Sequence, residues 1–151
     1  ETVDLLDVAR ECVERQKVNA RHSYISLTYL GESAPVTGSR VLLDELCQNL
    51  CDNAIRYNRP GGKVQIITAC TRDGHCTLTV KDNGIGIPKE AQTSVFERFY
   101  RVDKSRSKAT GGTGLGLAIV KHIARIHNAR IKLDSVVDEG TTITVIFETA
   151  S

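Results

Sequence analysis

The stretch KVQIITACTRDGHCTLTVKDNGIGIP, residues 63–88, carries most of the information about the fold. Apolar and polar residues alternate over 63–71 and again over 75–82, and Asp73 and Gly74 lie between the two runs. Alternation with period two is typical of a strand with one buried face, and an Asp-Gly pair favours a two-residue turn. We therefore predict a β-hairpin that belongs to a largely antiparallel sheet.

The second predicted strand ends in Asp82, and the loop that follows it is rich in glycine. Glycine and proline are common in plain turns, so a turn without any binding role is one interpretation. The alternative is a binding surface, because Gly84 and Gly86 allow the backbone to lie close to a flat ligand. In that case the carboxylate of Asp82 can accept a hydrogen bond from an exocyclic amine.

The rest of the chain adds helices and strands on both sides of this hairpin. Helical spacing of apolar residues predicts three long helices and a short helical piece, over residues 4–16, 39–57, 115–127 and 91–100, with Ser39 and Thr113 as N-caps. Alternation predicts further strands over residues 24–30, 129–136 and 141–150, whereas 31–38 has the composition of a turn. This order favours an α+β fold, a two-layer sandwich whose mixed, mostly antiparallel sheet is covered by helices on one face.

Composition narrows the class of protein. The 151 residues suit a single domain, 1–151, and the 40% hydrophobic and 25% charged content is that of an ordinary globular chain. A net charge of +2 gives no reason to expect binding to nucleic acid or to a membrane surface. The five cysteines are odd in number and contain no CxxC pair, so we expect them to be reduced, in a cytosolic domain.

The helix predicted over 39–57 has an unusual polar face. Five residues fall within an arc of roughly 100° on this helix: Glu45, Asn49, Asp52, Asn53 and Arg56. A solvated helix face is the simplest interpretation of such a stripe. Asparagine is a poor helix former, however, and two asparagines one turn apart call for another reason. Amide oxygens aligned in this way suit Mg²⁺, which prefers oxygen ligands.

A second glycine-rich segment, GGTGLGLAIVK, spans residues 111–121 and leads into the last predicted helix. Free N–H groups at a helix N-terminus attract anions, above all phosphate, and basic residues precede this segment at Lys104, Arg106 and Lys108. The spacing fits neither the GxGxxG motif of dinucleotide-binding folds nor a P-loop, and the HRD and DFG elements of protein kinases are missing.

Four segments together resemble the catalytic, ATP-binding domain of sensor histidine kinases, within the wider group of gyrase, heat-shock chaperone and mismatch-repair ATPases. ELCQNLCDNAIRY resembles the N box of that family, DNGIGIP the G1 box, FERFYRVD the F box and GGTGLGLAIVK the G2 box. The boxes occur in the family order, and the resemblance covers essentially the whole chain. The F box favours histidine kinases over the other ATPases.

The resemblance implies a role for each candidate residue. Asn49 would bind Mg²⁺ with the help of Asn53, and Asp82 would accept a hydrogen bond from the adenine amine. The remaining contacts with ATP would come from residues in and around the boxes: Arg56, Tyr57, Gly84, Gly86, Ile87, Lys104, Gly112, Thr113, Gly114, Leu115 and Gly116. Arg101 and Lys104 would reach the γ-phosphate from a lid over about 98–113. Glu45 matches the general base of the hydrolysing relatives.

The resemblance also implies partners. Such kinases transfer the γ-phosphoryl group to a histidine on a separate dimerisation domain, and none of His22, His75, His122 and His127 lies in the expected motif. We therefore expect a cytoplasmic domain of a membrane-anchored bacterial sensor, with a response regulator downstream and no direct contact with the membrane. A gyrase-like or chaperone-like ATPase and a serine kinase of the anti-sigma type are the alternatives.

Overall fold

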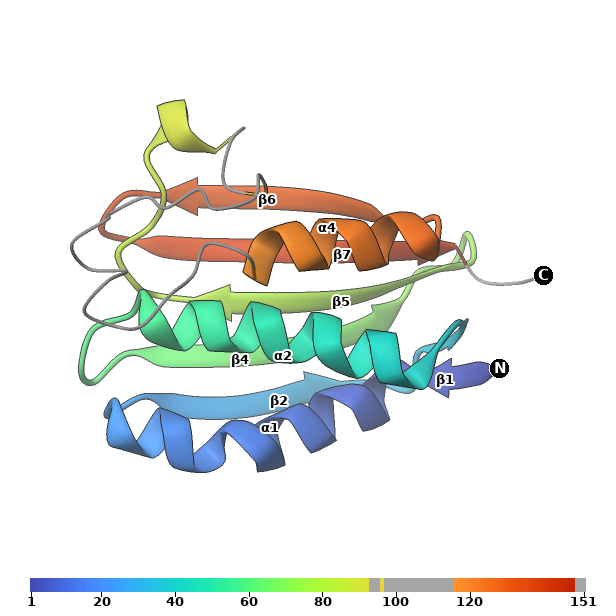
Figure 1. Ribbon diagram of the computed structural model, residues 1–151, viewed down its shortest axis with the longest axis horizontal. Helices are drawn as coiled ribbons and strands as arrows, with labels where there is room; N and C mark the ends of the chain where they lie inside the picture. The colour runs from blue at the N-terminus through green and yellow to red at the C-terminus, as the bar shows by residue number, and fades with distance from the viewer. Residues whose placement is uncertain (93–95, 97–115, 149–151) are drawn as a thin grey trace.

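The computed structural model describes residues 1–92, 96 and 116–148, and it is a two-layer sandwich (Figure 1). The strands are β1 (Thr2–Asp4), β2 (Ser26–Gly31), β3 (Pro35–Thr37), β4 (Lys63–Cys70), β5 (His75–Asp82), β6 (Arg130–Val136) and β7 (Gly140–Glu148). The helices are α1 (Leu5–His22), α2 (Arg40–Arg56) and α4 (Gly116–Ile126), with a short 3-10 helix, η1 (Lys89–Ala91). The predicted fold class is confirmed.

The main sheet has five strands in the order β2-β4-β5-β7-β6. Only β2 and β4 pair in parallel, and the other neighbours are antiparallel. The helices α1, α2 and α4 lie side by side on one face of this sheet (Figure 1). The strands alternate as expected, with side chains such as Ile66, Leu78 and Val145 buried against the helices. Burying one such side chain stabilises the fold by about 1.5–3 kcal/mol.

Helix α2 carries the polar face that the sequence singles out, and its N-terminal end is capped. Its predicted N-cap is confirmed, because the Ser39 hydroxyl accepts a hydrogen bond from the Leu42 N–H at 3.3 Å. Its opposite face packs into the core through Leu43, Leu46 and Leu50, all of which are buried. Helix α2 is therefore oriented by its apolar stripe, so that the asparagine face is turned away from the core.

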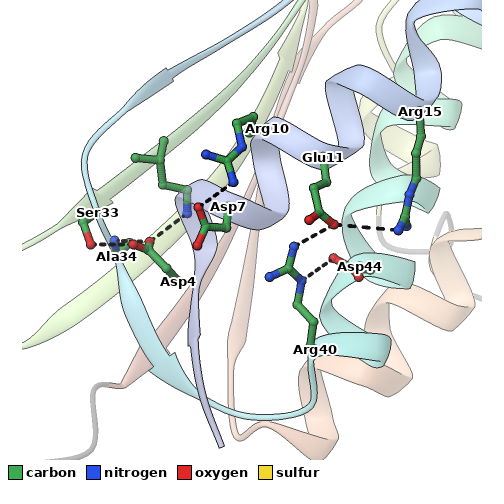
Figure 2. Close-up of polar contacts among 10 residues, drawn as sticks. Asp4, Asp7, Arg10, Glu11, Arg15, Ser33, Ala34, Arg40 and Asp44 are labelled. Atoms are coloured by element: carbon green, nitrogen blue, oxygen red, sulfur yellow. Dashed lines mark hydrogen bonds and ion pairs between the residues drawn. The ribbon is translucent and has the colours of Figure 1, made fainter.

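Helices α1 and α2 are joined by a small ionic network (Figure 2). The guanidinium of Arg40 at the start of α2 pairs with Glu11 of α1 at 2.8 Å and with Asp44 at 2.9 Å. At the start of α1, the Asp4 carboxylate accepts hydrogen bonds from the N–H groups of Leu6 and Ala34. Ala34 precedes β3, so this cap also joins α1 to the small sheet that β1 and β3 form.

The structure corrects several boundaries. Residues 35–37 form β3 in a segment expected to be a turn, and β1 pairs with this strand because Val3 and Val36 both pack into the core. The first helix continues to His22 rather than ending at residue 16. The hairpin turn comprises residues 71–74, because β4 ends at Cys70 and β5 begins at His75.

The expectation that every cysteine is reduced is wrong for one pair. Cys70 and Cys76 form a disulfide, whereas Cys12, Cys47 and Cys51 are free and buried. The register of the hairpin places Cys70 directly opposite Cys76, with 4.1 Å between their Cα atoms. The sequence shows both residues near the turn but does not by itself establish this register. Among the described residues, no helix is both long and apolar enough to cross a membrane.

Candidate functional site

Polar groups from four segments meet at one end of the sheet. Figure 1 shows that β5 ends there beside the C-terminal end of α2, the first turn of α4 and the connection between β6 and β7. The N-terminus and the β4–β5 turn lie at the other end. Antiparallel pairing explains this grouping in part, because the end of β5 lies beside the start of β7.

Asp82 is the centre of this group. It is the last residue of β5, and it pairs with Val64 on one side and with Thr141 on the other. Its Oδ1 accepts hydrogen bonds from the Gly84 N–H at 2.9 Å and from the Thr141 N–H at 3.2 Å. Within the described part of the chain, Oδ2 has no hydrogen-bond partner. The carboxyl group is thus fixed through one oxygen, and the other oxygen is available to a ligand.

The pKa of Asp82 reflects this environment. Burial raises the pKa of the carboxyl group from its ordinary value of 3.8 to about 6, and the hydrogen bonds from Gly84 and Thr141 oppose the rise only in part. No cation is among the causes. A half-buried carboxylate without a basic partner costs free energy in the folded state, and such groups cluster at functional sites.

The glycines of the loop after Asp82 have a packing role. A Cβ atom at Gly84 would lie 2.5 Å from the carbonyl oxygen of Tyr57, and one at Gly86 would collide with the carbonyl of Val136. Gly86 also has a φ of 74°, which favours glycine. Between these glycines, the Ile85 N–H donates to the Tyr57 carbonyl at 3.1 Å. The loop is therefore held tightly against the end of α2 and the β6–β7 connection.

The polar face of α2 reaches the same end of the molecule. Asn49 and Asn53 are half-buried there, and the Asn49 Nδ2 donates to the Glu45 carbonyl at 2.9 Å. A Cβ atom at Gly116, the first residue of α4, would lie 3.6 Å from the Asn49 Oδ1. The structure thus brings Asn49 and Gly116 together, although 67 positions separate them in the sequence.

Two other predicted residues of α2 have different surroundings. Arg56 pairs through its Nε with Asp52 at 2.8 Å, so its charge is balanced within the helix. Glu45 is exposed, and the backbone carbonyl of this residue is the acceptor for Asn49. The described residues contain no group of three His, Cys, Asp or Glu side chains able to hold a metal ion. A cation at this end would therefore depend on amide oxygens.

Several residues of the predicted site are not among those that the structure describes. The residues Arg101, Lys104, Gly112, Thr113, Gly114 and Leu115 lie outside the described residues, as does the whole of the predicted lid, 98–113. Phe96 is described, and it packs half-buried against the core. Ile87 is buried, with 7% of its surface exposed, at the far end of the loop.

Three polar residues at this end were missed from the sequence: Gln92, Ser135 and Thr141. Thr141 donates to Asp82, and the Ser135 hydroxyl accepts a hydrogen bond from the Ile87 N–H at 2.7 Å. Both positions read as ordinary strand residues. The only sequence signal for Ser135 and Thr141 was the turn at Asp138–Gly140. This turn predicts that β6 and β7 pair, but it does not show that Ser135 and Thr141 contact the loop after β5.

Comparison of the sequence with models of known protein families shows which family the chain belongs to. A family model described as histidine kinase-, DNA gyrase B- and HSP90-like ATPase matches residues 38–151, which include α2, the loop after Asp82 and α4. The chain belongs to this family.

The curated relatives of the chain are sensor kinases. The chain is 49% identical over 150 residues to the sensor-like histidine kinase SenX3 of Mycolicibacterium smegmatis, an alignment that covers 96% of this chain and 38% of the relative. It is 41% identical over 147 residues to the sensor histidine kinase YkoH of Bacillus subtilis, covering 97% and 31% of the two chains. The chain therefore spans less than two fifths of the length of these family members.

Solved structures agree with this placement. The mycobacterial sensor histidine kinase MprB superposes with a TM-score of 0.84 at 32% identity, covering 98% of this chain and 97% of that one. Full-length ShkA in complex with AMPPNP has a TM-score of 0.84 at 22% identity, over 100% of this chain and 32% of that one, and it shows the likeness of fold alone. The resemblance to the catalytic, ATP-binding domain of histidine kinases is confirmed.

Proposed function

We propose that this domain binds Mg·ATP at the end of the sheet around Asp82 and donates the γ-phosphoryl group to a histidine on a separate dimerisation domain. The observation that carries the proposal is the Asp82 carboxyl group. It is fixed through Oδ1, its Oδ2 has no partner among the described residues, and burial raises its pKa to about 6. A donor from a ligand would compensate for this burial, and the exocyclic amine of adenine is such a donor.

The base would lie against the loop that follows Asp82. Gly84 and Gly86 let the loop pack against Tyr57 and Val136, so that its backbone forms the surface beside the base, and Ile87 supplies an apolar contact. Tyr57, at the end of α2, would pack beside the base. Its carbonyl already accepts a hydrogen bond from the Ile85 N–H, so the loop and Tyr57 form one surface.

The metal ion and the phosphates would lie along α2. Asn49 and Asn53 supply the hard oxygen ligands that Mg²⁺ prefers, and Asn49 Oδ1 lies beside the start of α4. Mg²⁺ keeps several waters and binds through few protein ligands and the substrate phosphates, which fits a site whose described residues form no carboxylate cluster. When bound, the ion would neutralise charge on the phosphates.

The phosphate chain would extend toward the N-terminus of α4. Its orphan N–H groups favour anions, and the residues expected to contribute are Arg56, Lys104, Gly112, Thr113, Gly114, Leu115 and Gly116. Arg101 would contact the γ-phosphate. In the transfer, a histidine nitrogen forms a bond to the γ-phosphorus while the bond to the bridging oxygen breaks, and ADP leaves. Glu45, one turn before Asn49, would be the candidate group to accept a proton.

The whole protein would be a membrane-anchored sensor whose cytoplasmic kinase part passes the phosphoryl group to a response regulator. Neither nucleic acid nor direct membrane contact is part of this proposal. A gyrase-like or chaperone-like ATPase and a serine kinase of the anti-sigma type use similar nucleotide sites, but the named relatives are sensor histidine kinases.

Transfer to a partner distinguishes these functions. The domain is mixed with a dimerisation domain that carries a phosphoacceptor histidine, in the presence of Mg²⁺ and ATP labelled in the γ-phosphate. We expect label on the partner that is lost in acid and retained in base, and none when the histidine is replaced by alanine. Phosphate release without labelled partner would favour an ATPase, and acid-stable label would favour a serine kinase.

A further inference from the structure

We propose that Ser135 and Gln92 are positioning residues of the nucleotide site, which hold Ile87 and Asp82 in the geometry that selects an adenine base. This inference rests on the proposed function. Neither residue belongs to the segments that resemble the family boxes, and Ser135 lies 48 positions beyond Ile87 in the sequence. Both act through the backbone that they fix.

The Ser135 hydroxyl lies at the junction of the loop and the β6–β7 hairpin. Its Oγ is 2.7 Å from the Ile87 N, 3.0 Å from the Gly140 O and 2.8 Å from the Thr141 Oγ1. One assignment of protons satisfies all three contacts. The Ile87 N–H and the Thr141 hydroxyl donate to the Ser135 Oγ, and the Ser135 hydroxyl donates to the Gly140 carbonyl. The Ser135 hydroxyl thus uses both of its acceptor sites and its single donor.

The Gln92 side chain completes the hold on Ile87. Its Nε2 donates to the Ile87 carbonyl at 3.0 Å and to the Ser135 carbonyl at 3.1 Å. The backbone N–H of Ile87 is therefore bound by Ser135, and its carbonyl is bound by Gln92. Both polar groups of a buried residue are satisfied by two side chains that sequence reasoning did not connect with it.

Ser135 also reaches the other end of the loop. Thr141 contacts Ser135 through its hydroxyl, and the N–H of the same residue donates to the Asp82 Oδ1. Thr141 is buried, with 8% of its surface exposed, so it cannot exchange these contacts freely with water. One hydroxyl group thus supports both the apolar contact at Ile87 and the orientation of the carboxyl group that would accept the adenine amine.

The consequence is a specific effect on base selection. Replacing Ser135 by alanine leaves the Ile87 N–H without its acceptor and removes the hydroxyl contact of Thr141, whose N–H binds the Asp82 Oδ1, so we expect the Asp82 carboxyl group to be less well oriented. An adenine loses part of its hydrogen bond to Asp82, whereas an inosine base, which has a carbonyl group in place of the amine, has no such bond to lose. A residue that only stabilised the fold would weaken both ligands equally.

The test is a calorimetric titration of ATP and of inosine triphosphate into four proteins: the wild type, Ser135→Ala, Ser135→Thr and Ser26→Ala. Ser26 is a matched control, because it is an exposed serine on the opposite edge strand. We expect ATP affinity to fall about fivefold in Ser135→Ala, with a smaller loss for inosine triphosphate. Ser135→Thr keeps the hydroxyl and should preserve the selectivity, as should Ser26→Ala.

Gln92→Ala provides a second, independent variant, since this half-buried side chain can be removed without a cavity in the core. It should also lose ATP affinity. A selectivity for ATP that is unchanged in both Ser135→Ala and Gln92→Ala, while the wild type prefers ATP, would overturn the positioning role alone. A wild type that binds neither nucleotide would overturn the proposed function and this inference with it.

Discussion

The two ends of the sheet satisfy their polar groups in different ways. At the end near the chain termini, Cys70 and Cys76 are covalently joined, and His127 uses both ring nitrogens, one with the Ile123 carbonyl at 2.8 Å and one with the Ser39 N–H at 3.1 Å. At the opposite end, Asp82 is half-buried with only one of its oxygens paired among the described residues. The first end satisfies these groups within the fold, whereas we propose that a ligand pairs with the Asp82 carboxylate at the second.

Among the changes that distinguish the two ends of the sheet, glycine substitutions should have the largest effect on stability. A Cβ atom at Gly140, whose φ is 132°, would collide with the Asp82 carbonyl, and one at Gly38 would collide with the His127 ring. We expect Gly140→Ala to lower the free energy of unfolding by roughly 3 kcal/mol, because strain and overpacking add. ATP affinity should also fall. Gly38→Ala should lower stability less, since its φ is not positive, and leave ATP affinity intact, as measured by urea unfolding and calorimetry. Equal losses of ATP affinity in both variants would contradict the difference between the ends.

The buried carboxyl group should make stability depend on pH. Below about pH 4 both the folded and the unfolded chain carry the Asp82 proton, whereas between pH 4 and pH 6 only the folded chain keeps it. The folded state therefore binds more protons in this window, and the free energy of unfolding should fall as pH rises through it, by up to about 3 kcal/mol. Asp82→Asn should remove this fall and be more stable than the wild type at pH 7.

The control for this effect is Asp134→Asn, which makes the same change at an exposed position of β6. Its curve of stability against pH should follow that of the wild type. If Asp82→Asn and the wild type show the same slope between pH 4 and pH 6, the carboxyl group is not strained by burial, and the contrast between the two ends loses its main support.

The disulfide offers a perturbation confined to the end near the chain termini. Opening the short loop that it closes should lower the free energy of unfolding by about 2 kcal/mol, from the entropy gained by the unfolded chain. Urea unfolding of the wild type with and without reductant measures the difference, and the double variant Cys70→Ser and Cys76→Ser should not respond to reductant. ATP affinity should not change, because five residues of β5 separate Cys76 from Asp82. Equal stability of the wild type under both conditions would count against the disulfide.

The smallest expected effect concerns the metal. Asn49→Ala should weaken ATP binding about fivefold when Mg²⁺ is present, and the loss should shrink when both proteins are titrated in chelator. Asn19→Ala on α1 is the matched control, since this asparagine is exposed and pairs only with Gln16 among the described residues. A loss of equal size with and without Mg²⁺ would mean that Asn49 acts on the nucleotide or on the helix itself.

The fold followed from the sequence where one face of an element is apolar. The alternation in β4, β5 and β7 and the stripe of α2 identified the layers, because burial alone decides which face turns inward. Strands β1 and β3 were missed because three residues are too few to establish a period. Cys70 and Cys76 were not paired because the observed register leaves three residues, 72–74, in the loop, one more than the Asp-Gly pair suggested, and this difference places Cys70 opposite Cys76 rather than opposite Thr77.

The sequence predicted only those site residues whose type or spacing is unusual for the helix or strand that contains them. Asp82, Asn49 and the glycines stand out by type and spacing, and the structure brings Asp82 and its loop to the same end as Asn49 and Gly116. Ser135 and Thr141 do not stand out, because their importance arises from contacts across two strand pairings. Such contacts require a three-dimensional register that no local pattern contains.

The central claim is that Asp82 is the base-recognising group of an ATP site, and calorimetry tests it most directly. ATP and Mg²⁺ are titrated at pH 7 into the wild type, Asp82→Ala and the surface control Asp134→Ala. We expect at least about a tenfold loss of affinity in Asp82→Ala, because the adenine amine loses its acceptor, and no change in Asp134→Ala. Near-normal ATP affinity in a folded Asp82→Ala protein would contradict it.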